Sequence, residues 1–222
     1  MGKIEEALNL LNEKLPLKGR QQQLEKELLE VHKGILSSFV EKGRPLTRKE
    51  IAGKLAGKDV DRALKRLGGD DLVVLDAEEE NVVGAYPMTM QDTPHHLIVN
   101  GHKIHAMCAL DSLSVSPMFG LEVAIDSRCH VTGEPIHIHQ KAKEVLEVKP
   151  SPEVHVGIRW QNTCGCAASS LCMEMVFLKD RDTARKWQGE AVNDISLFTL
   201  PEAIEFGERF FAPLIQDESI SE

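Results

Sequence analysis

The spacing of apolar residues changes part-way along this chain of 222 residues, and that change constrains the fold more than any other feature. Up to about residue 69, apolar residues recur every three or four positions, which is the spacing of amphipathic helices. Beyond Pro94, apolar and polar residues alternate as in half-buried strands, on both sides of Asn100-Gly101, the strongest short hairpin signal in the chain. The sequence therefore predicts an α+β fold, in which a helical part precedes a mainly antiparallel β part with flanking helices.

Four helices are predicted before residue 70, over residues 4–15, 24–43, 47–55 and 59–69. Thr47 and Glu50 have the spacing of a capping box, and Asp59 is a suitable N-cap for the fourth helix. Two short strands are predicted next, at residues 72–75 and 81–86. Three helices followed by a two-stranded ribbon is the order of elements in a winged helix. We therefore expect a winged-helix-like helical domain over residues 1–92.

The charge of the expected wing argues against DNA binding. Its turn carries four acids, Asp76, Glu78, Glu79 and Glu80, and the whole chain has a formal net charge of -9. Phosphate contacts supply most of the affinity of nucleic-acid-binding proteins and need a basic surface. We therefore expect the helical domain to be a packing module, and we expect no nucleic-acid partner.

Residues 93–222 are expected to form a second, mainly β domain that carries the catalytic residues. Strands are predicted at residues 95–99, 102–106, 121–125, 135–139, 154–160 and 175–177, and a short helix over residues 183–188. A second capping box, Thr199 with Glu202, predicts a final helix that has Pro201 at its first position and runs to about Phe211.

The N-terminus and the cysteines bear on the compartment in which the chain works. No run of about 18 apolar residues is present, and residues 1–6 carry acids where a signal peptide needs an apolar core. We expect a cytoplasmic protein with no membrane contact. Its five cysteines are an odd number in a chain too large to need disulfides for stability, so we expect reduced thiols.

Cys108 and Asp111 lie three positions apart, just after the predicted hairpin. Positions three apart share one face of a helix, so the thiol and the carboxyl are expected to point into one pocket. Taken alone, a buried cysteine is more often an apolar filler, and an aspartate at a helix start is more often a cap. The interpretation therefore depends on the other cysteines, which are Cys129, Cys164, Cys166 and Cys172.

Zinc binding and hydrolysis are poorly supported by the spacing. A structural zinc site needs paired ligands with two to four residues between them, repeated once, and Cys164-Gly165-Cys166 is too tight for that. A serine hydrolase is disfavoured because the chain has no Gly-x-Ser-x-Gly nucleophile elbow. The histidines near the predicted strands are expected at solvated or edge positions rather than as ligands; these are His95, His96, His102, His105 and His137.

Two distant thiolates and one carboxyl suit a different chemistry, that of a soft metal bonded to carbon. Soft cations select cysteine sulfur over nitrogen or oxygen, and two thiolates on mercury push electron density toward the metal-bound carbon. A carboxyl beside one thiol can take that thiol's proton and deliver it to the carbon. The second thiol of such a site must come from the cysteines downstream of Cys108.

Three segments of the second half resemble the organomercurial (alkylmercury) lyases. They are residues 105–113 (His-Ala-Met-Cys-Ala-Leu-Asp-Ser-Leu), residues 127–135 (Ser-Arg-Cys-His-Val-Thr-Gly-Glu-Pro), and Cys172 with Trp187 fifteen residues beyond it. The resemblance spans residues 97–211, and the expected helical N-terminal domain agrees with that of the family. It implies protonolysis, in which R–Hg(II) and a proton give R–H and Hg(II) without an organic cofactor.

The resemblance also implies roles for individual residues. Cys108 would be the thiol that attacks the metal, Asp111 the proton shuttle and Cys172 the second thiol, so that these three hold the product Hg(II). Cys129 matches a family cysteine whose role is structural. External thiols would be needed for turnover, and the ion would pass to small thiols or to a mercuric reductase.

Several side chains depart from the family pattern. Met107 stands where relatives tend to have tryptophan, and Met173 where some have a further cysteine. Cys164 and Cys166 add two sulfurs, which are either further metal ligands or part of a tight turn of small buried residues. Two alternatives therefore stay open. One is a lyase for another organometallic substrate, and the other is a soft-metal sensor or metallochaperone that uses Cys164, Cys166 and Cys172.

Overall fold

The computed structural model describes residues 2–55, 57, 59–160, 166–191 and 193–216. Five helices occupy its first third: α1 (Lys3–Lys14), α2 (Leu17–Gln22), α3 (Lys26–Lys42), α4 (Arg48–Lys54) and α5 (Val60–Gly69). The predicted end signals act as expected, because Thr47 and Glu50 form the capping box of α4 and Asp59 caps α5. Gly43 ends α3 in the left-handed conformation, with φ 67°. The short helix α2 was not predicted.

The helices lead into a ribbon that belongs to the main sheet. Strands β1 (Val74–Leu75) and β2 (Val82–Ala85) pair as expected, and β2 continues through β3 (Met88–Thr89) to the next part of the chain. The order of α3, α4, α5, β1 and β2 is the order expected from the sequence. The two strands that follow the helices are therefore hydrogen-bonded into the same sheet as the strands of the β part.

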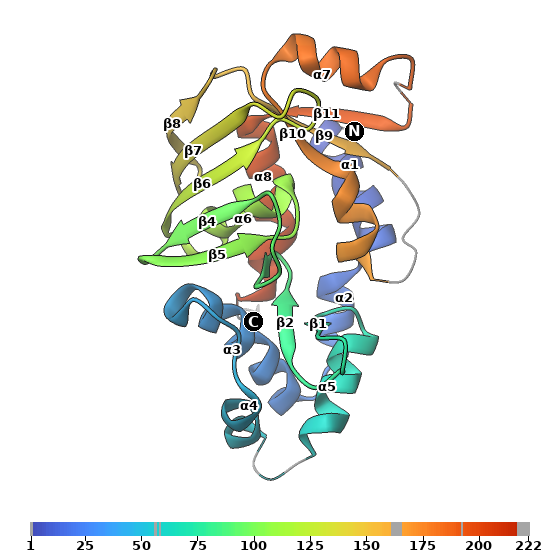
Figure 1. Cartoon of the computed structure of the whole chain (residues 1–222). Helices are drawn as coiled ribbons and strands as arrows, with labels where there is room; N and C mark the ends of the chain where they lie inside the picture. The colour runs from blue at the N-terminus through green and yellow to red at the C-terminus, as the bar shows by residue number, and fades with distance from the viewer. Residues whose placement is uncertain (1, 56, 58, 161–165, 192, 217–222) are drawn as a thin grey trace, which may run out of the picture.

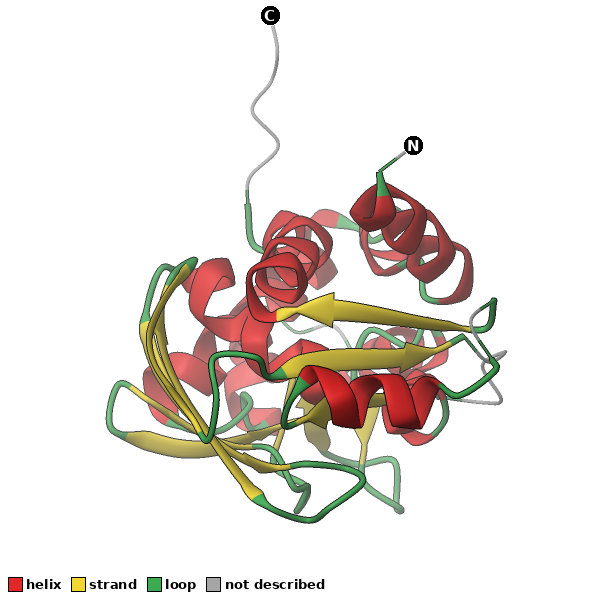
Figure 2. Cartoon of the chain, turned by 90° about the horizontal axis from the view of Figure 1, so that it is seen from above, coloured by secondary structure: helices red, strands yellow, loops and turns green. Residues whose placement is uncertain are grey.

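The remaining strands of the larger sheet are β4 (His96–Val99), β5 (His102–Ala106), β6 (Glu122–Arg128), β7 (Pro135–Lys141) and β8 (Glu144–Lys149). Within the described residues, eight strands form this sheet, in the order β1-β2-β3-β5-β4-β6-β7-β8. Asn100 and Gly101 turn β4 into β5 with positive φ angles of 49° and 77°, which is the conformation that the Asn-Gly hairpin requires. Figure 2 shows the sheet curving around the helices.

A smaller sheet lies beside the larger one (Figure 1). It consists of β10 (Met175–Leu178), β9 (His155–Arg159) and β11 (Ile195–Thr199), in that order, with α7 (Arg181–Gln188) packed against it. Neighbouring strands pair antiparallel throughout the part of the chain that the structure describes. The α+β class and its antiparallel sheet are thus confirmed, although β3, β8 and β11 were not predicted.

Helix α6 (Ala109–Phe119) is the centre of the fold. Residues 109–116 are all buried, as expected for a helix that is covered on every side. One face packs against α8 (Leu200–Phe211), and others contact β6 and β10. A Cβ atom placed on Gly207 of α8 would lie only 2.0 Å from the Ser114 hydroxyl, so this glycine permits the close approach of the two helices. The start of α6 is therefore held firmly in place.

One histidine lies in an environment that was not expected. His95 is 7% exposed, its Nδ1 lies 2.9 Å from the Ser127 hydroxyl, and burial lowers its pKa to about 4. The expectation that it lies at a solvated or edge position was wrong, because β4 pairs with β5 and β6 on its two sides and the ring of Phe177 contacts His95.

Among the described residues, no helix combines the length and apolar character needed to cross a bilayer.

Candidate active site

Cys108 lies where strand β5 leads into helix α6. Its backbone is extended, with φ -153° and ψ 180°, and it serves as the N-cap of the helix. The Asp111 N–H donates a hydrogen bond of 3.3 Å to Cys108 Sγ, so sulfur takes the place that a Ser or Asp oxygen usually has at an N-cap. The positive end of the helix favours negative charge at this sulfur. Both Cys108 and Asp111 are buried, at 0% and 2% exposure.

Cys172 reaches the same site from a different segment of the chain. It lies in the short 3₁₀ helix Leu171–Glu174, directly before β10, and is 4% exposed. Its thiol donates toward Asp111 Oδ2 over 3.8 Å. The donor atoms of Cys108, Asp111 and Cys172 all lie within 4.8 Å of one another. The structure therefore brings together the three residues named from the sequence.

Burial sets the protonation of these groups. It raises the pKa of Asp111 to about 7, against the opposing effect of hydrogen bonds from the two thiols. Burial also raises the pKa of Cys108 well above its usual range. The hydrogen bond with Cys108 lowers the pKa of Cys172, but burial and the charge of Asp111 outweigh it and raise that pKa to about 11. Both thiols are thus neutral at pH 7, and Asp111 is partly protonated.

The geometry suits an ion that binds two sulfurs. A metal–thiolate bond of about 2.3 Å, as for zinc, requires the two sulfurs to lie no more than roughly 4.6 Å apart. The two sulfurs lie within 4.8 Å of one another, which is close to that limit. Soft ions displace thiol protons, and the Asp111 carboxyl, 3.8 Å from Cys172 Sγ, can accept such a proton.

Comparison with known proteins identifies the family of this chain. Residues 88–212 match the sequence model of the alkylmercury lyases, and they make up more than half of the chain. The chain belongs to the alkylmercury lyase family. An alkylmercury lyase of Bacillus cereus is 32% identical over 165 residues, which cover 74% of this chain and 73% of the relative. One of Staphylococcus epidermidis is 30% identical over 177 residues and 80% of each chain.

A solved structure of similar fold is the mercury-bound form of MerB2. Its TM-score against this chain is 0.74, and the match covers 90% of this chain and 98% of that one. The two are 22% identical in sequence, so the likeness concerns the fold. It extends over the helical N-terminal part as well as over the region matched by the alkylmercury lyase model.

Tyr86 and Asp71 are two residues at this family member's site that the sequence reasoning missed. The Tyr86 hydroxyl donates to Asp71 Oδ1 at 2.9 Å, accepts from the Ala168 N–H at 2.9 Å and lies 3.2 Å from Cys166 Sγ. Burial raises the pKa of Tyr86, and the charge of Cys172 adds to this effect. Tyr86 is the single tyrosine of the chain, and it stands before a proline, which is the one signal that was available.

The other candidate cysteines differ in position. Cys166 is half-buried next to Tyr86, and burial raises its pKa. It lies outside the group of donor atoms formed by Cys108, Asp111 and Cys172. Cys164 is outside the described residues. Cys129 is buried at the end of β6, away from the two thiols, and its thiol is hydrogen-bonded by Thr132.

Met107 and Trp187 complete the residues singled out in the sequence. Met107 is buried, and its Cε lies where a side chain on Gly84 would begin, 2.7 Å from a Cβ built there. Trp187 lies on α7, where its ring contacts His130 and Arg159. Met107 is therefore wedged against β2 beside Cys108, whereas Trp187 packs on the smaller sheet.

Proposed function

We propose that this chain is an organomercurial lyase that cleaves carbon–mercury bonds by protonolysis. The observation that carries the proposal is the convergence of two buried thiols and one buried carboxyl within 4.8 Å, in a chain of the alkylmercury lyase family. The catalytic residues are Cys108, Asp111 and Cys172, and the same three hold the product Hg(II).

The first step exchanges one thiol for another on the metal. The substrate is R–Hg–SR′, an organomercurial with an external thiolate. The Cys108 sulfur bonds to mercury, the Hg–SR′ bond breaks, and the Cys108 proton leaves on R′SH. The helix N-terminus and the Asp111 N–H favour the negative charge that builds up on Cys108 Sγ during this exchange.

The second step moves a proton from sulfur to carbon. As the Cys172 sulfur bonds to mercury, its proton passes to Asp111 Oδ2, toward which it already points. Asp111 then protonates the metal-bound carbon, the C–Hg bond breaks, and R–H leaves while Hg(II) stays on Cys108 and Cys172. A carboxyl with a pKa near 7 is well matched to both accepting and delivering the proton at neutral pH.

The rest of the cycle needs no organic cofactor. External thiols remove Hg(II) from the two cysteines, and the ion passes to small thiols or to a mercuric reductase. Residues 1–92 form a winged-helix-like packing module without a DNA partner, and residues 93–222 form the catalytic domain. The place of work is the cytoplasm. The acidic turn with Asp76 and Glu78 supports the absence of DNA binding.

Product analysis tests the proposal. Purified protein with phenylmercury and excess small thiol should release benzene, measured by headspace gas chromatography, together with one equivalent of Hg(II). Methylmercury and another aryl or alkyl organometallic, assayed in parallel, define the substrate range. A protein that binds phenylmercury but releases no hydrocarbon would instead be a sensor or metallochaperone, and a gel shift with duplex DNA at low salt would identify the sensor.

A further inference from the structure

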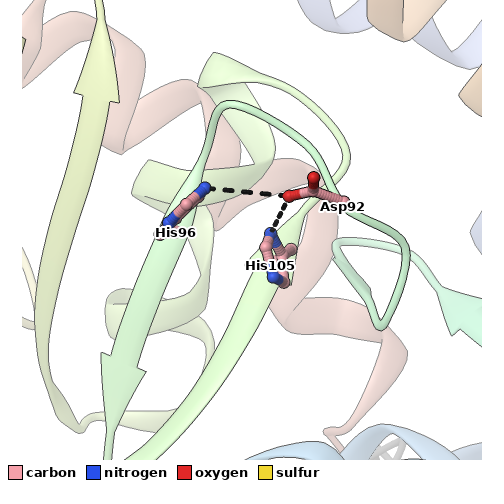
Figure 3. A group of neighbouring side chains, drawn as sticks. All are labelled: Asp92, His96 and His105. Carbon is pink, nitrogen blue, oxygen red and sulfur yellow. Dashed lines mark ion pairs between the residues drawn. The ribbon is translucent and has the colours of Figure 1, made fainter.

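A second group of possible metal ligands lies on the outer face of the larger sheet. Asp92, His96 and His105 present one oxygen and two ring nitrogens that all lie within 4.8 Å of one another (Figure 3). Asp92 Oδ1 is 4.0 Å from His96 Nε2 and 4.0 Å from His105 Nδ1. The two imidazole rings are 4.7 Å apart at their centroids and inclined by 60°. One carboxylate oxygen of Asp92 therefore lies at the same distance from a ring nitrogen of each histidine.

The fold fixes the positions of all three residues. His96 on β4 and His105 on β5 are direct partners across the antiparallel pair, so their side chains stand on the same face. Asp92 precedes Thr93, whose hydroxyl donates to the Ala106 carbonyl at 2.7 Å and ties this loop to β5. The side chains of Asp92, His96 and His105 remain 95%, 58% and 24% exposed, so an ion can reach them from solvent.

The donor set selects the class of ion. Two imidazole nitrogens and one carboxylate oxygen suit borderline divalent ions, above all Zn(II), and leave a fourth position for water. Ligand atoms around tetrahedral zinc lie about 3.3 Å apart, so the two 4.0 Å separations must shorten by less than about 1 Å. The ion must also replace the two long contacts of His105 Nδ1 with Thr93, at 3.3 Å from its N–H and 3.4 Å from its carbonyl oxygen.

Neighbouring pairs on the same face provide an internal comparison. His137 Nδ1 contacts Asp126, and His139 Nε2 lies 2.7 Å from Glu122. Each of these pairs offers two donors, whereas Asp92, His96 and His105 are the one exposed group of three found in the described part of the chain. A third ligand is what separates an ion site from an ordinary histidine–carboxylate ion pair.

We propose that Asp92, His96 and His105 form a binding site for Zn(II) or a similar borderline divalent ion. The bound ion links the loop at Asp92 to β4 and β5, and its ligand His105 lies three residues before Cys108. This site is separate from the thiol site in position and in donor chemistry, and the proposal does not depend on lyase activity.

Imidazole NMR tests the site directly. Full-length reduced protein labelled with ¹⁵N is titrated with Zn(II), and ring resonances are assigned from single histidine variants. We expect the rings of His96 and His105 to shift together, ahead of His137 and His139. Loss of a supporting partner of a metal ligand costs roughly tenfold or more in affinity, so His96→Ala, His105→Ala and Asp92→Ala should each weaken binding at least that much.

The matched control is His139→Ala, which removes an exposed histidine with a carboxylate partner from the same sheet face. It should leave the affinity at His96 and His105 unchanged. Far-ultraviolet circular dichroism checks that each variant is folded. The proposal is overturned if Zn(II) perturbs only cysteine resonances, if His137 shifts at lower Zn(II) than His96, or if folded His105→Ala binds as tightly as the wild type.

Discussion

The described part of the chain holds two groups of three possible metal ligands, and they differ in burial as much as in donor type. Cys108, Asp111 and Cys172 are buried where α6 begins, whereas Asp92 and His96 lie open on the face of the sheet. Burial keeps the two thiols protonated, so an ion must be soft enough to displace their protons. The exposed group offers its donors directly to water. Position in the fold thus assigns the buried group to soft ions and the exposed group to borderline ions.

The largest expected effect comes from removing a thiol of the buried group. Cys108→Ser and Cys172→Ser should each lower benzene release from phenylmercury at least about a thousandfold, as loss of a nucleophile does in other enzymes. The measurement is the rate of hydrocarbon release with excess small thiol. Cys129→Ser, a buried cysteine outside the group, is the matched control for substitution of a buried sulfur.

Substitution in the exposed group sharpens the contrast. His96→Ala should leave benzene release within about twofold of wild type, because this exposed side chain contributes no proton or sulfur to the reaction. If Cys108→Ser keeps a tenth of the wild-type rate, or if His96→Ala loses as much activity as Cys108→Ser, the division of roles between the two groups is wrong.

The proton carrier gives the next largest effect. Asp111→Asn keeps both thiols but cannot shuttle the proton, so hydrocarbon release should fall by about 10² to 10⁴, the usual contribution of a general acid. Binding of phenylmercury, followed by isothermal titration calorimetry, should be retained. Asp126→Asn is the matched change at an exposed carboxyl. Full activity in Asp111→Asn would remove the shuttle from the mechanism.

The parts of the fold that were predictable have local causes. The capping boxes at Thr47 and Thr199 and the Asn100-Gly101 hairpin each depend on residues a few positions apart, and all three were predicted. The same holds for Cys108 and Asp111, which share the first turn of α6. A spacing rule is sufficient wherever the interacting residues are neighbours in the chain.

The parts that were missed depend on distant contacts. Tyr86 contacts Cys166, 80 residues away in the sequence, and no periodicity of the sequence predicts that contact. His95 is buried by β6 and Phe177, which its own neighbours in sequence do not reveal. Strand β8 is mostly exposed and half of its residues are charged, as in edge strands, so it lacked the alternation of a half-buried strand. Cys172 was placed beside Asp111 through the family resemblance, because spacing alone does not bring together residues so far apart.

The last expected effect concerns stability and separates a buried carboxyl from an exposed one. The pKa of Asp111 is about 7 in the folded chain and about 3.9 when unfolded, so the folded state binds more protons between these values. The free energy of unfolding contributed by Asp111 is therefore intact below about pH 4 and is lost as the pH rises through 7. Three pKa units set an upper limit of about 4 kcal/mol on this loss.

Urea unfolding at pH 5 and pH 8 under reducing conditions measures the effect. Asp111→Asn has no carboxyl to ionise, so it should gain stability relative to wild type on going from pH 5 to pH 8. Asp92→Asn, whose side chain is 95% exposed, should show no such gain. An equal wild-type-to-Asn difference at both pH values for Asp111 would mean that the buried site is hydrated enough to hold a carboxylate, and the contrast between the two groups would then rest on donor type alone.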